Sequence, residues 1–193
     1  MPFSTFTSIS DFTATYNHEA CCWNSALRSA GHGDTIAIVD INFPAFEVAQ
    51  KTTYGKVIPL AGASAEEALA AVASVCPVDL FVDQPLQSVF FFHLYSSCIY
   101  ITYVSFIYIC CYSHMAPDPG LSMPPLGEEV INKGQEAVSQ HCNGPIFQPV
   151  ERAKFYGEAR KAFAIIQTAE RRPYGNFLIK KGVVGPDGND LQP

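Results

Sequence analysis

Positively charged residues are scarce in this sequence. Lysine and arginine together number 12, against 18 aspartates and glutamates, so the formal net charge is −6. The densest basic spots are the pairs Arg171–Arg172 and Lys180–Lys181. Neither pair forms the stripe of cations that follows a phosphate backbone. This charge balance argues against a protein that binds nucleic acid.

Patterns typical of metal sites and disulfide frameworks are also missing. The sequence contains 7 cysteines, but no two have the C-x-x-C spacing of a zinc site, and an odd number does not suit a disulfide framework. The first 20 residues lack the basic start and the continuous apolar core of a signal peptide. We therefore expect reduced thiols and a cytoplasmic location.

One long segment has no charged residue at all. Residues 86–114 contain no Asp, Glu, Lys or Arg, and aromatic and β-branched residues dominate them. Their length and hydropathy would allow a membrane span, but the Lys and Arg flanks that orient a span are absent. Their commonest residues have codons rich in U, as a translated intron would give. We interpret this apolar insert as a retained intron or a gene-model error, with a membrane span as the alternative.

On both sides of the insert, strand patterns alternate with helix patterns. The helix over 64–76 is the clearest, because Ser64 and Glu67 have the spacing of a capping box and Pro77 ends it. Gly134 weakens the helical pattern of 127–141. Strands are predicted over 35–41, 78–82, 162–168 and 177–184, and a further helix over 155–161. The alternation predicts an α/β fold, layered, with a partly parallel sheet flanked by helices.

Three blocks of sequence occur in the order found in one known family. They are 30–45 (AGHGDTIAIVDINFPA), 77–85 (PVDLFVDQP) and 150–184 (VERAKFYGEARKAFAIIQTAERRPYGNFLIKKGVV). Together they resemble the fucose mutarotase / ribose pyranase (RbsD/FucU) family. The resemblance implies one RbsD-like domain over 26–184, interrupted by the insert at 86–114. Residues 1–25 are an atypical N-terminus without the family's regular leucines, and 185–193 form a polar tail.

The resemblance implies an enzyme that interconverts the α and β anomers of L-fucose or a related monosaccharide. In that reaction one group protonates the ring oxygen and another removes the proton of the anomeric hydroxyl. Neither a metal nor a redox cofactor is needed. The family also implies a homo-oligomer with sites near the subunit contacts. We expect no nucleic-acid partner because of the charge balance, and no membrane partner because the insert lacks Lys and Arg flanks and interrupts a single domain. Ribose pyranase activity and a non-catalytic sugar-binding relic are the alternatives.

His32, in the GHGD element, is the candidate proton donor. Histidine suits acid–base work because its ordinary pKa lies near neutrality, although Gly31 and His32 could simply end a helix. Asp40 follows a predicted buried strand, where open α/β sheets gather ligands, although an aspartate there could only cap a turn. The resemblance makes His32 catalytic and Asp40 a substrate contact.

Tyr174 and Asn176 belong to a YGN element that follows Pro173 and also fits a reverse turn. In the family this element lines the sugar site, which implies that Tyr174 is catalytic and that Asn176 binds substrate. Asp79, Arg152 and Tyr156 match further positions that approach the sugar. For Asp79 and Arg152 the alternative is an ordinary surface charge, and for Tyr156 a place in the core.

Overall fold

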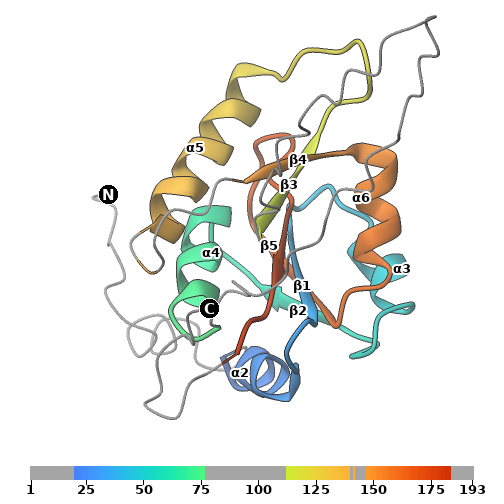
Figure 1. Ribbon diagram of the computed structural model, residues 1–193, viewed down its shortest axis with the longest axis vertical. Helices are drawn as coiled ribbons and strands as arrows, with labels where there is room; N and C mark the ends of the chain where they lie inside the picture. Colours follow the sequence, from blue (N-terminus) through green and yellow to red (C-terminus); the bar gives the residue numbers. More distant parts are fainter. Residues whose placement is uncertain (1–19, 77–111, 140, 142–146, 184–193) are drawn as a thin grey trace, which may run out of the picture.

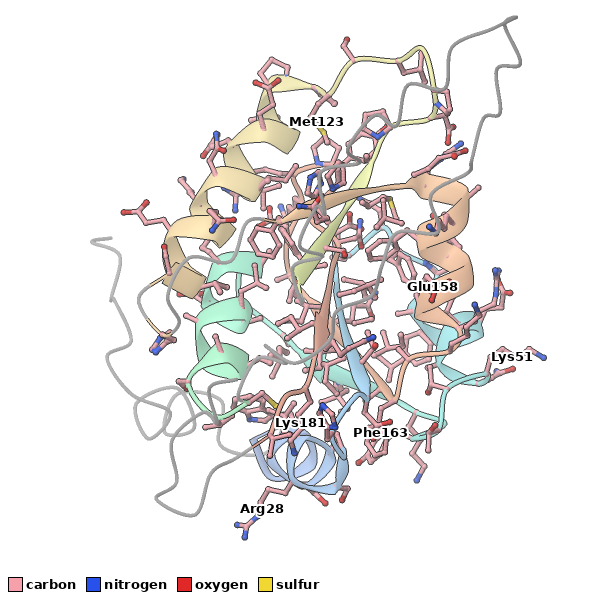
Figure 2. The ribbon with its side chains drawn as sticks, in the orientation of Figure 1. Arg28, Lys51, Met123, Glu158, Phe163 and Lys181 are labelled. Atoms are coloured by element: carbon pink, nitrogen blue, oxygen red, sulfur yellow. The ribbon has the colours of Figure 1, made fainter. Side chains whose placement is uncertain are left out.

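A six-stranded mixed sheet forms the centre of the molecule (Figure 1). The structure is a computed structural model, and it describes residues 20–76, 112–139, 141 and 147–183. The strand order is β2-β5-β1-β6-β3-β4. Strand β1 pairs in parallel with β5 and antiparallel with β6, while β5 pairs in parallel with β2. Strand β3 pairs antiparallel with β6 and in parallel with β4, which confirms the partly parallel sheet.

The elements alternate along the chain as the sequence predicts for an α/β fold. The strands are β1 (Thr35–Val39), β2 (Val57–Leu60), β3 (Tyr112–Ala116), β4 (Gln148–Glu151), β5 (Ala164–Thr168) and β6 (Phe177–Lys180). The helices are α2 (Ala20–Ser29), α3 (Ala45–Ala49), α4 (Ala65–Ala73), α5 (Pro125–Ser139) and α6 (Arg152–Ala159).

Side chains of the central strands alternate between two apolar layers. In β1, Ile36 and Ile38 pack with α2, α4 and α5, whereas Ala37 and Val39 pack with α3 and α6. Figure 1 shows α4 and α5 on one side of the sheet and α3 and α6 on the other, with α2 below the strands. Because both faces of β1 are covered, all its residues after Thr35 are apolar and buried, as in parallel strands of layered folds.

Helices α4 and α5 approach each other closely on one face of the sheet. The predicted capping box at the start of α4 is confirmed: Ser64 accepts from the backbone N–H of Glu67, and Glu67 accepts from that of Ser64. Gly134 makes the close approach possible, since a Cβ there would come within 2.8 Å of Leu69 Cδ1. The glycine that weakens the helical pattern therefore lies where α4 and α5 pack together, and a larger residue there would force Leu69 to shift.

Most predicted elements are present, with bounds that differ by a few residues. One boundary differs in a more important way: Tyr112–Ala116 form β3, so residues 112–114 belong to the sheet although the sequence analysis counts them in the insert. The rest of that insert and the strand predicted over 78–82 lie outside the described residues. Within the part of the chain that is described, no helix is long and apolar enough to cross a membrane.

Candidate functional site

The carboxyl end of β1 meets the start of β6 at a buried pair of polar side chains. Asp40 follows β1 and Asn176 precedes β6, and their exposed fractions are only 4% and 3%. Asn176 Nδ2 donates to Asp40 Oδ2 at 2.6 Å, and the backbone N–H of Asp40 donates to Asn176 Oδ1 at 3.0 Å. Because β1 and β6 run antiparallel, residues 136 positions apart in sequence are joined by two hydrogen bonds.

Burial sets the electrostatics of Asp40. It raises the pKa of the carboxyl above its ordinary value of 3.8, although hydrogen bonds from Asn176 and from the backbone of Asn42 and Phe43 act in the opposite direction. The Asn42 contact is 2.9 Å long and ends on Asp40 Oδ1. Each carboxylate oxygen has more than one acceptor position. The carboxylate is therefore held in one orientation and keeps free acceptor positions.

Tyr174 stands beside this pair in an unusual backbone conformation. Its φ is +64°, and it is the only non-glycine residue with a positive φ in the described parts of the chain. An L-residue in this left-handed region costs about 1–2 kcal/mol. The side chain packs partly buried against the layer that contains Leu178 and Met115. Backbone strain of this kind persists only where the surrounding structure imposes it, and strained residues are found most often at functional sites.

Tyr156 and Arg152, both from α6, extend the same neighbourhood. The ring of Tyr156 stacks on Phe43 with 5.1 Å between ring centroids, so the loop after β1 and helix α6 are in contact. Arg152 pairs with Asp118 at 2.5 Å, and the two side chains are 52% and 34% exposed. The Asp118 hydrogen bond is the main cause that raises the pKa of Arg152, and Tyr156 and Tyr174 also contribute. Arg152 therefore lies at the solvent-facing rim beside both tyrosines.

His32 lies at the opposite end of the same strands. It is exposed in the loop between α2 and β1, where the backbone N–H of Gly33 donates to the carbonyl of Lys181, just beyond the far end of β6. From Gly33 to Asp40 the chain runs along β1 at about 3.3 Å per residue, a separation of about 20 Å. One chain therefore cannot offer His32 and Asp40 to the same small ligand.

The structure thus brings together Asp40, Tyr156, Tyr174 and Asn176, with Arg152 at the rim, and leaves His32 apart. Asp79 lies outside the described residues. Sequence reasoning missed Phe43, Asp118 and Glu170. Glu170, which is 5% exposed, had one available signal: it follows a predicted buried strand by two residues. In the described ranges, no group of three or more His, Cys, Asp or Glu side chains could hold a metal ion.

Comparisons with known proteins identify the family of the chain. The model of the RbsD / FucU transport protein family matches residues 23–184. A fucose mutarotase of Danio rerio is 30% identical over 165 residues, covering 83% of this chain and 86% of the relative. An L-fucose mutarotase of Actinobacillus pleuropneumoniae serotype 5b is 29% identical over 159 residues, covering 81% and 86%.

A solved structure shares the fold. The fucose mutarotase of Streptococcus pneumoniae, crystallised in complex with L-fucose, matches with a TM-score of 0.61 at 23% identity, over 84% of this chain and 91% of that chain. The family match extends from α2 through the whole described sheet to the residues after β6. The chain therefore belongs to the RbsD / FucU family.

Proposed function

We propose that this protein is a sugar isomerase that interconverts the α and β anomers of L-fucose or a closely related monosaccharide. One observation carries the proposal: the buried Asp40–Asn176 pair lies beside the strained Tyr174 at the sheet edge where α/β folds gather ligands. Family membership and the names of the relatives support the reaction class. Because the relatives are only about 30% identical to this chain, the identity of the preferred sugar belongs to the proposal.

The proposed reaction uses acid–base chemistry alone. A catalytic group donates a proton to the ring oxygen while another accepts the proton of the anomeric hydroxyl, so the bond between the anomeric carbon and the ring oxygen breaks. Rotation of the resulting aldehyde and reversal of both proton transfers close the ring on the other face. We assign these transfers to Tyr174 and His32. Such transfers by positioned groups accelerate reactions by about 10²–10⁴-fold.

The remaining site residues hold the sugar in this proposal. Asp40 accepts hydrogen bonds from hydroxyls, and Asn176 fixes the carboxylate while presenting its own amide. Tyr156 and Arg152 close the solvent side of the site. Asp79 is assigned to the substrate through the family resemblance alone.

His32 takes part only if a second copy of the chain supplies it. Its separation of about 20 Å from Asp40 within one chain exceeds the reach of a monosaccharide. A homo-oligomer in which the loop between α2 and β1 of one copy reaches the Asp40 edge of another would complete the site. We therefore propose that the protein acts as a homo-oligomer.

We also propose that the protein works in the cytoplasm without spanning a membrane. Strand β1 precedes the undescribed residues 77–111 and pairs directly with β5 and β6, which follow them. A single crossing between these strands would put paired strands on opposite sides of a bilayer about 30 Å thick.

Anomer exchange of L-fucose tests the proposed function. Full-length protein, with a chelator and without nucleotide, should accelerate exchange between the two anomeric protons in saturation-transfer NMR, with D-ribose measured in parallel. Tyr174→Phe should lower the accelerated rate about 100-fold, because it removes the hydroxyl that transfers the proton. Tyr54→Phe is the matched control, since Tyr54 lies next to Phe163 before β5, at the other end of the sheet from Asp40 and Asn176. An anomer exchange rate equal to that in buffer, for both sugars, would refute the proposed enzymatic activity.

A sugar-binding protein without catalysis is the second candidate. One specific observation favours it: a single chain contains the Asp40–Asn176 pair and Tyr174 but holds His32 at the other end of the sheet. In that case L-fucose would bind, its resonances would broaden in the presence of the protein, and the exchange rate would stay at the buffer value.

A further inference from the structure

Glu170 is a buried carboxylate that gathers backbone donors from two segments. It follows β5 and is 5% exposed. Its Oε1 accepts from the backbone N–H groups of Arg171 at 3.0 Å and Arg172 at 2.9 Å. Its Oε2 accepts at 3.3 Å from the backbone N–H of Ala65, the first residue of α4. The carboxylate therefore joins the loop before Tyr174 to the start of a helix.

The side chain of Arg172 encloses the same carboxylate. Arg172 Nε donates to Glu170 Oε1 at 2.8 Å and Arg172 Nη2 to Glu170 Oε2 at 2.6 Å, a bidentate pair. Arg172 also reaches Glu66 and Glu129. Burial raises the pKa of Glu170, but the hydrogen bonds from Arg172 and Ala65 outweigh it and lower the pKa to about 2. Glu170 therefore remains ionised in the folded protein at neutral pH.

Glu170 touches both segments that carry the candidate site. A Cβ on Gly175, between Tyr174 and Asn176, would come within 2.7 Å of Glu170 Cγ, so the glutamate stem lies directly against this turn. The backbone carbonyl of Glu170 accepts from the N–H of Ile41 at 3.0 Å, next to Asp40. Displacing Glu170 must therefore disturb the two partners of the buried pair from both sides.

We propose that Glu170 is a positioning residue that holds the Tyr174–Asn176 turn against Asp40 in the geometry that the isomerase needs. The inference rests on the proposed function of the site. The side chain acts through the backbone of the turn and touches no substrate. Its five hydrogen bonds fix the carboxylate, and the fixed stem limits where Gly175 can lie.

Three substitutions in the full-length protein separate this role from a general loss of stability. Glu170→Gln keeps the shape of the side chain but replaces one acceptor oxygen with a donor that faces other donors. Gly175→Ala adds a Cβ that meets Glu170 Cγ. Glu66→Gln is the matched control, since it alters another carboxylate on the same Arg172 without touching the turn. All three are assayed below their melting temperatures.

Glu170→Gln and Gly175→Ala should each lower the exchange rate at saturating L-fucose about tenfold or more, because small misplacements of catalytic groups have large effects. Glu66→Gln should stay within about twofold of the parent. Hydrogen–deuterium exchange, read by mass spectrometry on peptides covering 171–178, should speed up in the first two variants and not in the control.

The outcomes are distinct. The positioning role would be overturned if folded Glu170→Gln kept the exchange rate of the parent and its deuterium uptake did not change. It would also be overturned if Glu66→Gln lost as much activity as Glu170→Gln, because the effect would then come from Arg172. An inactive parent refutes the proposed function instead. The deuterium uptake of the turn then still decides whether Glu170 holds it.

Discussion

At the scale of single residues, the two buried carboxyls respond to pH in opposite directions. The pKa of Asp40 is raised, so its contribution to stability is present at low pH and declines as pH rises through the raised value. The pKa of Glu170 is lowered from 4.5 to about 2. The contribution of Glu170 to stability is therefore complete above pH 4.5 and is lost as the pH falls toward 2.

This difference gives a testable pH dependence. The melting temperature of the parent should fall more steeply than that of Glu170→Gln between about pH 5 and about pH 2. Gln cannot be protonated in this range, so the difference between the two curves isolates Glu170 from the other carboxyls. Differential scanning calorimetry at closely spaced pH values measures it. Parallel curves would show that Glu170 titrates as it does in the unfolded chain.

Residue-level inference from sequence reached some of the site but not its geometry. Asp40 could be placed at a ligand edge because it follows a buried strand, whereas Tyr174 and Asn176 were reached only through the family resemblance of the YGN element. The direct Asp40–Asn176 hydrogen bond depends on the antiparallel pairing of β1 and β6, which local patterns do not reveal. Glu170 lies in a loop, and loops have no periodic pattern of apolar and polar residues from which the burial of a glutamate could be predicted.

At the scale of elements, two helical glycines should respond to alanine in opposite ways. Alanine is the better helix former by about 1 kcal/mol. At Gly157 in α6 an added Cβ meets nothing within 4 Å, so Gly157→Ala should stabilise the protein by about 0.5–1 kcal/mol. At Gly134 the Cβ would meet Leu69 and Phe177, both fully buried, so Gly134→Ala should destabilise it by about 1 kcal/mol.

Urea denaturation of both variants measures the two effects, with the slope of the transition as a check that the unfolded states are comparable. Equal stabilisation by both alanines would mean that α4 and α5 separate easily and that Gly134 does not set their distance.

The elements that sequence analysis missed lack the local patterns by which strands and helices are predicted, for different reasons. Strands β2 and β4 are the outer strands of the described sheet, and each contains a proline, Pro59 and Pro149. Proline is tolerated at sheet edges but breaks the pattern by which strands are predicted. Helix α3 has only five residues, too few for a periodic signal. Strand β3 begins inside a charge-free aromatic run without alternation. By contrast, α4 has a capping box and β1 a short β-branched run, and both were predicted.

At the scale of the whole molecule, the placement of His32 makes the assembly testable by complementation. His32→Ala and Asn176→Ala should each lose most exchange activity. Co-expressed, they should recover activity, because a site can take its histidine from one chain and its amide from another. Random mixing gives about a quarter of the parent activity when each site combines two copies.

Differently tagged chains, purified through both tags, provide the mixed oligomer, and saturation-transfer NMR measures its activity. The control mixes His32→Ala chains with chains that carry Glu47→Gln, an exposed substitution on α3. This mixed oligomer should keep about half of the parent activity, because half of its sites take their histidine from a Glu47→Gln chain. A mixed oligomer of the two inactive variants that remains inactive would show that His32 does not act across copies.

The conformation of Tyr174 has a consequence for anyone who would engineer this chain. Its φ of +64° is a conformation that glycine and asparagine adopt at little cost, so replacing the tyrosine by either relieves backbone strain. A library selected only for heat resistance would therefore be drawn toward glycine or asparagine at this position, and the phenol would be lost. Thermal selection and selection for sugar turnover should diverge at Tyr174, so the two screens must be run together.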